Sequence, residues 1–232
     1  MIDNRWIRMG GVAGIGYVLI AVVAGALPGA PPEANGNPST YQAYFIEHQQ
    51  ALVVQAWMYA LAAPLWLIFA ISVRRVLRST ADSGYLAELF FVGTGIVLGL
   101  LMVTQAMQIA VAQHAAALSA DVAFLLGTHF GGVLIGLWGF LIATTAVAYA
   151  FSVFAYGGLP KWTGYLAVLT FLMDLVASTG VFFRTGPFCL EGGFSAWAPA
   201  VSLLFWYLGT SIALLRTPNY AEPKAAAGEL RT

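Results

Sequence analysis

Charged residues are scarce in this sequence. Ten Lys and Arg and ten Asp and Glu make up 9% of the 232 residues, whereas 60% of the residues are hydrophobic. A soluble domain carries about 25% charged and about 45–50% apolar residues, so this composition excludes a water-soluble fold. With a mean hydropathy of +0.80, the sequence predicts an integral membrane protein of one domain.

Cysteines and basic runs are also nearly missing. Cys189 is the only cysteine, which excludes an internal disulfide and an all-cysteine metal or iron–sulfur site. The formal net charge is zero and no basic run occurs, so nucleic acid is not an expected partner. Nucleotide-binding glycine loops, Gly-x-Ser-x-Gly and zinc-protease patterns are missing as well. No motif therefore names an enzyme class, and no cofactor is predicted.

Long apolar runs dominate instead. Six of them reach the roughly 20 residues that a helix needs to cross the hydrocarbon layer, and none alternates with the two-residue period of a strand. The expected fold is all-α: a polytopic bundle of six transmembrane helices within residues 1–217. We place the spans at about 9–27, 51–73, 86–113, 124–154, 162–183 and 194–215. Residues 218–232, rich in alanine and charge, predict a disordered tail.

The cations lie almost entirely on one side of these spans. The links and ends on that side carry Arg5, Arg8, Arg74, Arg75, Arg78, Lys161, Arg216, Lys224 and Arg231, and only Arg184 falls on the other. The positive-inside rule therefore predicts that both termini and the tail are cytoplasmic, in what we expect to be a bacterial cytoplasmic membrane. Ala24-Gly25-Ala26 would also fit a signal-peptide cleavage site; cleavage would leave five spans with unchanged orientation.

A short amphipathic segment is expected between the first two spans. Ser39 and Gln42 stand three residues apart, as in a capping box. The residues Tyr41, Tyr44, Phe45 and His48 then follow at helical spacing on one face. The segment predicts an interfacial helical turn, with a functional lid as the alternative.

Small residues recur at a spacing that favours helix packing. Gly95 and Gly99, Gly127 and Gly131, and Gly132 and Gly136 each stand four residues apart, and Gly139 continues the last pair. In a membrane, such residues let helix backbones approach one another. We expect packing within the bundle, and a homo-oligomer through these glycine faces is the alternative.

The link before the fifth span carries a recognisable turn. It consists of Gly158-Leu159-Pro160-Lys161-Trp162-Thr163-Gly164, with Pro160 suited to a first helical turn and Trp162 to the membrane interface. This turn resembles the Leu-Pro-Arg-Trp-x-Gly turn of bacterial six-helix membrane families catalogued as domains of unknown function, with Lys161 in place of the arginine. The resemblance implies a six-helix architecture and no established activity.

Asp174 is the sharpest candidate for chemistry. An acid near the membrane centre costs about 2.5–3.5 kcal/mol, and charged residues within spans are therefore functional-site hypotheses by default. Asp174 lies just beyond the midpoint of the fifth span, so we expect it to face the bundle interior. A catalytic or proton-transfer role is one interpretation, and a structural hydrogen bond to a neighbouring helix is the other.

Further candidate ligand-binding residues lie in the outer halves of other spans. They are Gln55 on the second span, Thr104, Gln105 and Gln108 on the third, and Trp138 on the fourth. The spacing of Thr104, Gln105 and Gln108 places them on one flank of their helix, which we expect Asp174 to face. Interhelical hydrogen bonds of about 0.6–2 kcal/mol each are the alternative role of the glutamines.

Three more candidates stand at the outer ends of the spans. His114 and His129 flank the hairpin turn between the third and fourth spans, but no His-x-x-x-His or Glu-x-x-His spacing supports a metal site. We therefore predict no metal and keep both histidines as ligand-binding candidates. Arg184 could bind an anionic headgroup or substrate through its planar guanidinium; interfacial snorkelling is the alternative.

Three functions fit these features. The first is a protein that binds or transforms a small amphiphilic molecule, of the lipid or isoprenoid class, in an outer-facing polar pocket at Asp174. The second is a non-catalytic membrane subunit that packs on a partner, and a transporter is the least favoured. Membrane lipids and a hydrophobic small molecule are the expected partners.

The predicted orientation can be tested by cysteine labelling. In a chain whose Cys189 is replaced by alanine, a cysteine at Ser119 should react with a membrane-impermeant maleimide in intact cells. A cysteine at Ser79 should react only after permeabilisation, because positive-inside topology puts Ser79 in the cytoplasm. Labelling of both positions from the same side would contradict the six-span topology.

Overall fold

The computed structural model describes most of the chain. The described residues are 4–29, 31–32, 37–79, 84–183, 185–190 and 192–216, without the side chains of residues 128 and 129. Every regular element within these ranges is a helix, which confirms the predicted all-α fold. The predicted tail, 218–232, lies outside the described residues.

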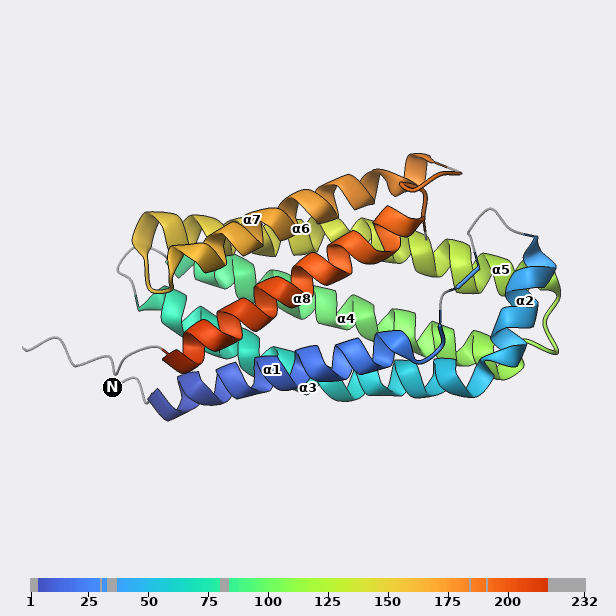
Figure 1. Ribbon diagram of the computed structural model, residues 1–232, viewed down its shortest axis with the longest axis horizontal. Helices are drawn as coiled ribbons and strands as arrows, with labels where there is room; N and C mark the ends of the chain where they lie inside the picture. Colours follow the sequence, from blue (N-terminus) through green and yellow to red (C-terminus); the bar gives the residue numbers. More distant parts are fainter. Residues whose placement is uncertain are drawn as a thin grey trace, which may run out of the picture.

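In the described part of the chain, six helical segments are long and apolar enough to cross a membrane, as predicted (Figure 1). Five are α1 (Asn4–Ala26), α3 (Gln49–Arg78), α4 (Gly84–His114), α7 (Lys161–Ser178) and α8 (Gly193–Arg216). The sixth joins α5 (Ala120–Phe124), the π-helix η1 (Leu125–Phe130) and α6 (Gly131–Tyr156). A 3-10 turn, η2 (Thr179–Phe182), extends α7 at its C-terminal end.

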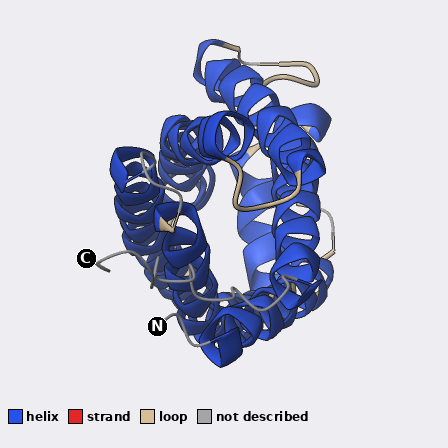
Figure 2. Ribbon diagram, turned by 90° about the vertical axis from the view of Figure 1, so that its left-hand side faces the viewer, coloured by secondary structure: helices blue, strands red, loops and turns tan. Residues whose placement is uncertain are grey.

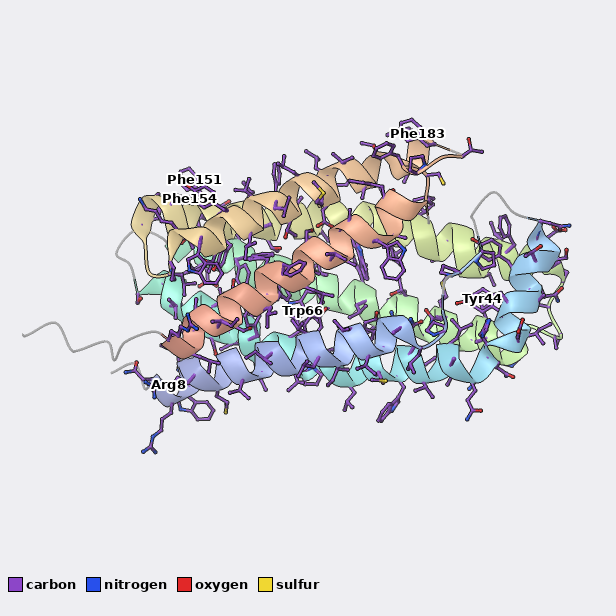
Figure 3. The ribbon with its side chains drawn as sticks, in the orientation of Figure 1. Arg8, Tyr44, Trp66, Phe151, Phe154 and Phe183 are labelled. Carbon is purple, nitrogen blue, oxygen red and sulfur yellow. The ribbon has the colours of Figure 1, made fainter. Side chains whose placement is uncertain are left out.

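The long helices form a closed ring. Each packs against two neighbours, in the order α1, α3, α4, α6, α7, α8 and back to α1, and the view along the bundle shows them surrounding a common centre (Figure 2). The first and last helices of the chain are thus neighbours. Large apolar side chains cover the outside of the ring: Phe151 and Phe183, for example, project away from it (Figure 3) and are 57% and 50% exposed. Such a surface suits lipid rather than water.

Aromatic residues fill much of the ring interior. Tyr207 on α8 packs against Trp66 and Phe69 on α3, with ring centroids 5.4 and 5.0 Å apart. Tyr149 on α6 lies 5.1 Å from Trp206 by the same measure. All five side chains are at most 3% exposed. This aromatic core occupies the half of the ring that the cation distribution predicts to be cytoplasmic.

Polar contacts at the same end of the bundle were not predicted. The Tyr149 hydroxyl donates to Thr163 Oγ1 at 2.7 Å and lies 3.1 Å from Thr210 Oγ1, which links α6, α7 and α8. Arg74 on α3 binds both carboxylate oxygens of Glu88 on α4. Because each pair joins different helices, these bonds stabilise the packing of the ring at this end.

A helix outside the ring covers the opposite end. This helix, α2 (Pro38–Glu47), packs on α5. Tyr41 and Phe45 are buried there in a second apolar cluster, separate from the aromatic core. Both belong to the helical face that the sequence predicted. The predicted capping box is wrong: Asn37, not Ser39, caps the helix by accepting from the Ser39 N–H. Gln42 donates instead to the carbonyls of residues 115 and 118.

The glycines divide into packed and open positions. On α4, a Cβ at Gly93 would lie 2.5 Å from Thr145 Cγ2, whereas nothing lies within 4 Å of a Cβ at Gly95 or Gly99. Gly136 lies near Leu190 and Val181, in the loop and turn at the outer end. Close packing, as the glycine spacing predicts, is therefore found at some glycines. Gly95 and Gly99 instead face out of the ring.

Two alanine variants on α4 test this division. Gly93→Ala should destabilise the detergent-extracted protein by about 1–3 kcal/mol, because Thr145 is β-branched and cannot swing its methyl group away. Gly95→Ala, two residues along, should be neutral or stabilising by up to about 1 kcal/mol, since alanine favours helix. Thermal unfolding measures both. Equal melting temperatures for the two variants would show that α4 and α6 do not cross at Gly93; a loss of stability in Gly95→Ala that depends on protein concentration would instead indicate a dimer face.

Candidate functional site

Asp174 lies in the interior of the ring, as predicted. Its side chain on α7 is 3% exposed, and its Oδ2 atom is buried without a hydrogen-bond partner. Buried polar atoms in folded proteins almost always have a partner, and an unpaired one costs about 1–3 kcal/mol or more for a charged group. The atom is therefore the clearest indication of a site in the described part of the chain.

The residues one turn away from Asp174 do not supply that partner. Thr170 and Ser178 share its face of α7, four residues before and after it. Thr170 donates to the carbonyl of residue 166 at 3.1 Å, and Ser178 donates to that of residue 175 at 2.7 Å. Because both hydroxyl protons are held by the helix's own backbone, the carboxyl is left as the free polar group on this face.

A glycine on α6 makes room for the Asp174 carboxyl. A Cβ at Gly139 would lie 3.2 Å from the Asp174 backbone oxygen and 3.6 Å from its Oδ1 atom. The two helices therefore cross closely at this point, and the α6 backbone forms one wall beside the carboxyl. A methyl group at position 139 would crowd the Asp174 backbone oxygen and reach van der Waals contact with the carboxyl.

The α8 helix forms the opposite wall. Asp174 is close enough to Tyr207 for the two to interact electrostatically. Ser202, 5% exposed, donates to the carbonyl of Pro199 at 2.9 Å, so its proton is also held within its own helix. Asp174 therefore lies beside the aromatic core, next to Gly139 of α6 and Tyr207 of α8.

The predicted glutamines fall into two groups. Gln108 on α4 donates to Gln55 Oε1 on α3 at 2.7 Å and to the carbonyl of Leu52 at 3.0 Å. This pair joins neighbouring helices, as the structural interpretation of the glutamines expects. Gln105 is 8% exposed and donates weakly to Thr104 Oγ1 at 3.4 Å, while its Oε1 atom is buried without a partner. Thr104 itself donates to the carbonyl of Leu101.

Asp174 is not hydrogen-bonded to the flank of α4 that carries Thr104, Gln105 and Gln108. The helices α4 and α7 are not neighbours in the ring, since α6 packs between them on one side. Among the described residues, four buried side-chain oxygens lack a hydrogen-bond partner, those of Ser152, Ser211, Gln105 and Asp174. Of the predicted site residues, Asp174 and Gln105 each contribute one, from different helices. Both would accept a hydrogen bond when Asp174 is ionised, and Asp174 would donate one when protonated.

The remaining candidates stand apart from Asp174 or cannot be placed. Trp138, next to Gly139, is half-buried and packs against the aromatic core. His114 ends α4 and is exposed, with Nδ1 3.0 Å from the carbonyl of Ala110. The His129 side chain and Arg184 lie outside the described residues, so the roles suggested for them stay predictions. Within the described ranges, no group of three His, Cys, Asp or Glu could hold a metal ion.

Two features of the site were missed in the sequence. Thr170, Asp174 and Ser178 repeat every four residues, a pattern that marks a polar face of the fifth span. Gly139 extends the spacing of Gly132 and Gly136 by three residues, but only the structure shows that it adjoins the acid. Comparison with protein-family models, with curated proteins and with solved structures gave no match.

Proposed function

We propose that this chain is an integral protein of a bacterial cytoplasmic membrane that binds, and acts on, a small amphiphilic molecule of the lipid or isoprenoid class inside the ring at Asp174. The observation that carries the proposal is the buried, unpartnered Oδ2 atom of Asp174. A bound molecule with a hydroxyl or amine would give that oxygen its missing partner. The unpartnered oxygen of Gln105 offers a second polar contact.

The apolar core of the ring favours an amphiphile over a fully polar ligand. Leu203 on α8, Leu101 on α4 and Ile142 on α6 are buried apolar residues of the ring core. Ligand sites are typically mostly apolar with a few polar groups that fix orientation. A hydrocarbon tail with one polar head meets both requirements.

The distribution of polar groups favours entry from the outer side. Gln55, Gln105 and Gln108 lie outward of Asp174 along their helices, whereas the aromatic core lies inward of it. The aromatic core also argues against a polar path to the cytoplasm, which a transporter would need. In this arrangement Asp174 is the hypothetical acid–base group, because a carboxyl in an apolar setting can hold or release a proton at a ligand atom.

A partner-binding role is the second candidate. Gly95 and Gly99 on α4 face outward with open space over them, between the exposed residues Val92, Ile96 and Val103. A second helix could approach closely along such a face. Partner binding on α4 does not involve Asp174. Substitution of Asp174 should therefore impair the ligand-binding function and leave the partner-binding function intact.

Substitution of Asp174 tests the ligand-binding proposal. Asp174→Leu should keep or raise the stability of the ligand-free protein, because it replaces an unpaired buried group by an apolar one of similar size; the gain should be about 1–3 kcal/mol. The same variant should abolish the rise in melting temperature that an isoprenoid alcohol, farnesol, produces in the wild type. Asp174→Asn keeps hydrogen bonding and should retain part of the rise, but should abolish any proton transfer.

The matched control is Thr170→Val, one turn away on the same face of α7. Its hydroxyl is bonded to its own helix, so the farnesol response should stay at the wild-type level. Amphiphiles that copurify with the protein can be identified by mass spectrometry of its organic extract. They should be retained by the wild type and Thr170→Val and lost from Asp174→Leu. Retention of the wild-type farnesol response and extract by Asp174→Leu would refute a ligand site at this carboxyl.

A further inference from the structure

A groove lies between α1 and α3 at the arginine-rich end of the bundle, away from Asp174. It has a volume of about 330 Å³ and is lined by Trp6, Met9, Ile68, Ile71, Ser72 and Arg75. Small-molecule sites have volumes of roughly 300–1,000 Å³. The groove is therefore large enough to hold part of a ligand.

The close crossing of α1 and α3 forms the floor of this groove. A Cβ at Gly10 would lie 2.1 Å from Ser72 Oγ, so the Gly10 backbone lies directly against the Ser72 side chain. Ser72 Oγ lies 3.2 Å from the carbonyl oxygen of Trp6 and 3.0 Å from that of Ile68, both within hydrogen-bonding distance. The one polar group of the floor is thus occupied, and the floor presents an apolar surface.

The walls of the groove are apolar and face outward from the ring. Trp6 is 54% exposed, Met9 43% and Ile71 42%. In a membrane these surfaces meet acyl chains, and a tryptophan at a helix end suits the headgroup level. The groove therefore has an apolar body with one end at the membrane surface.

Arg75 lies at that end, exposed and without an ion pair among the described residues. Glu88, the one acidic residue that the structure describes at this end, is 2.7 Å from Arg74 and 3.3 Å from Arg78. Arg8, at the same end of α1, points away from the bundle (Figure 3). The groove therefore ends in positive charge that no described carboxylate neutralises.

We propose that this groove binds an anionic phospholipid of the leaflet at the arginine-rich end. One acyl chain lies along Met9, Ile68 and Ile71, and the phosphate accepts hydrogen bonds from the Arg75 guanidinium, whose planar fork suits phosphate oxygens. A zwitterionic lipid lacks the net charge that Arg75 selects, and a free phosphate lacks the chain that the walls contact. The site is separate from Asp174 and independent of the function proposed there.

Four single variants of the full chain test the site. Arg75→Gln removes the headgroup contact, with Arg216→Gln on α8 as its control at the same end of the bundle. Ile71→Trp fills the groove while staying apolar, with Leu169→Trp on the exposed face of α7 as its control. Native mass spectrometry counts retained lipid, and thermal unfolding measures stabilisation by added dioleoylphosphatidylglycerol, dioleoylphosphatidylcholine or glycerol 3-phosphate.

We expect dioleoylphosphatidylglycerol to bind and stabilise the wild type more than the other two additives. Arg75→Gln should weaken its apparent affinity about fivefold, since one arginine near the surface contributes about that factor, and Ile71→Trp should reduce retention as well. Both controls should behave as the wild type. Equal weakening by Arg75→Gln and Arg216→Gln would show delocalised attraction, and equal effects of the three additives would show no lipid selectivity; either result overturns the proposal.

Discussion

The lack of water in the hydrocarbon layer is the constraint on which the rest of this structure depends. Backbone groups there must be satisfied within each helix, and the same condition extends to side chains. Thr94, Thr170, Ser178 and Ser202 each donate to a carbonyl of their own helix. Because so many polar groups are paired locally, the helices can pack through small and aromatic residues. The Asp174 carboxyl, with one oxygen left without a partner, is an exception.

Local patterns made most of the fold predictable. Six apolar runs predicted the six long helices, and Tyr41 and Phe45 predicted the buried face of α2. The long helices follow one another around the ring in chain order. Local patterns could not predict that α8 closes the ring on α1, because this contact depends on residues distant in sequence such as Gly14 and Ser211. The capping of α2 by Asn37 was missed because Asn37 and Ser39 are both good caps, and Pro38 favours the earlier start.

The candidate site was predictable only in part. The cost of an acid in lipid was enough to place Asp174 in the interior, whereas depth along the helices could not tell which side chains it meets. Depth suggested the flank of Thr104 and Gln108, but their helix lies two places away in the ring. What adjoins the carboxyl is Gly139, a residue with no side chain. The sequence identifies which residues carry a chemical group more readily than it identifies which residues pack beside that group.

The neighbouring positions of α1 and α8 have a consequence for how the protein is made. Spans emerge from the ribosome in chain order, so α1 packs on α3 long before α8 exists. Until then the α1 face at Gly11 and Gly14, which receives Ser211 of α8, has only lipid beside it. Before α8 is inserted, the ring is open between α7 and α1, and Asp174 on α7 lies beside this gap. Only the last helix closes the ring, so a chain truncated before α8 would carry its acid at the lipid boundary and be a target for membrane quality control.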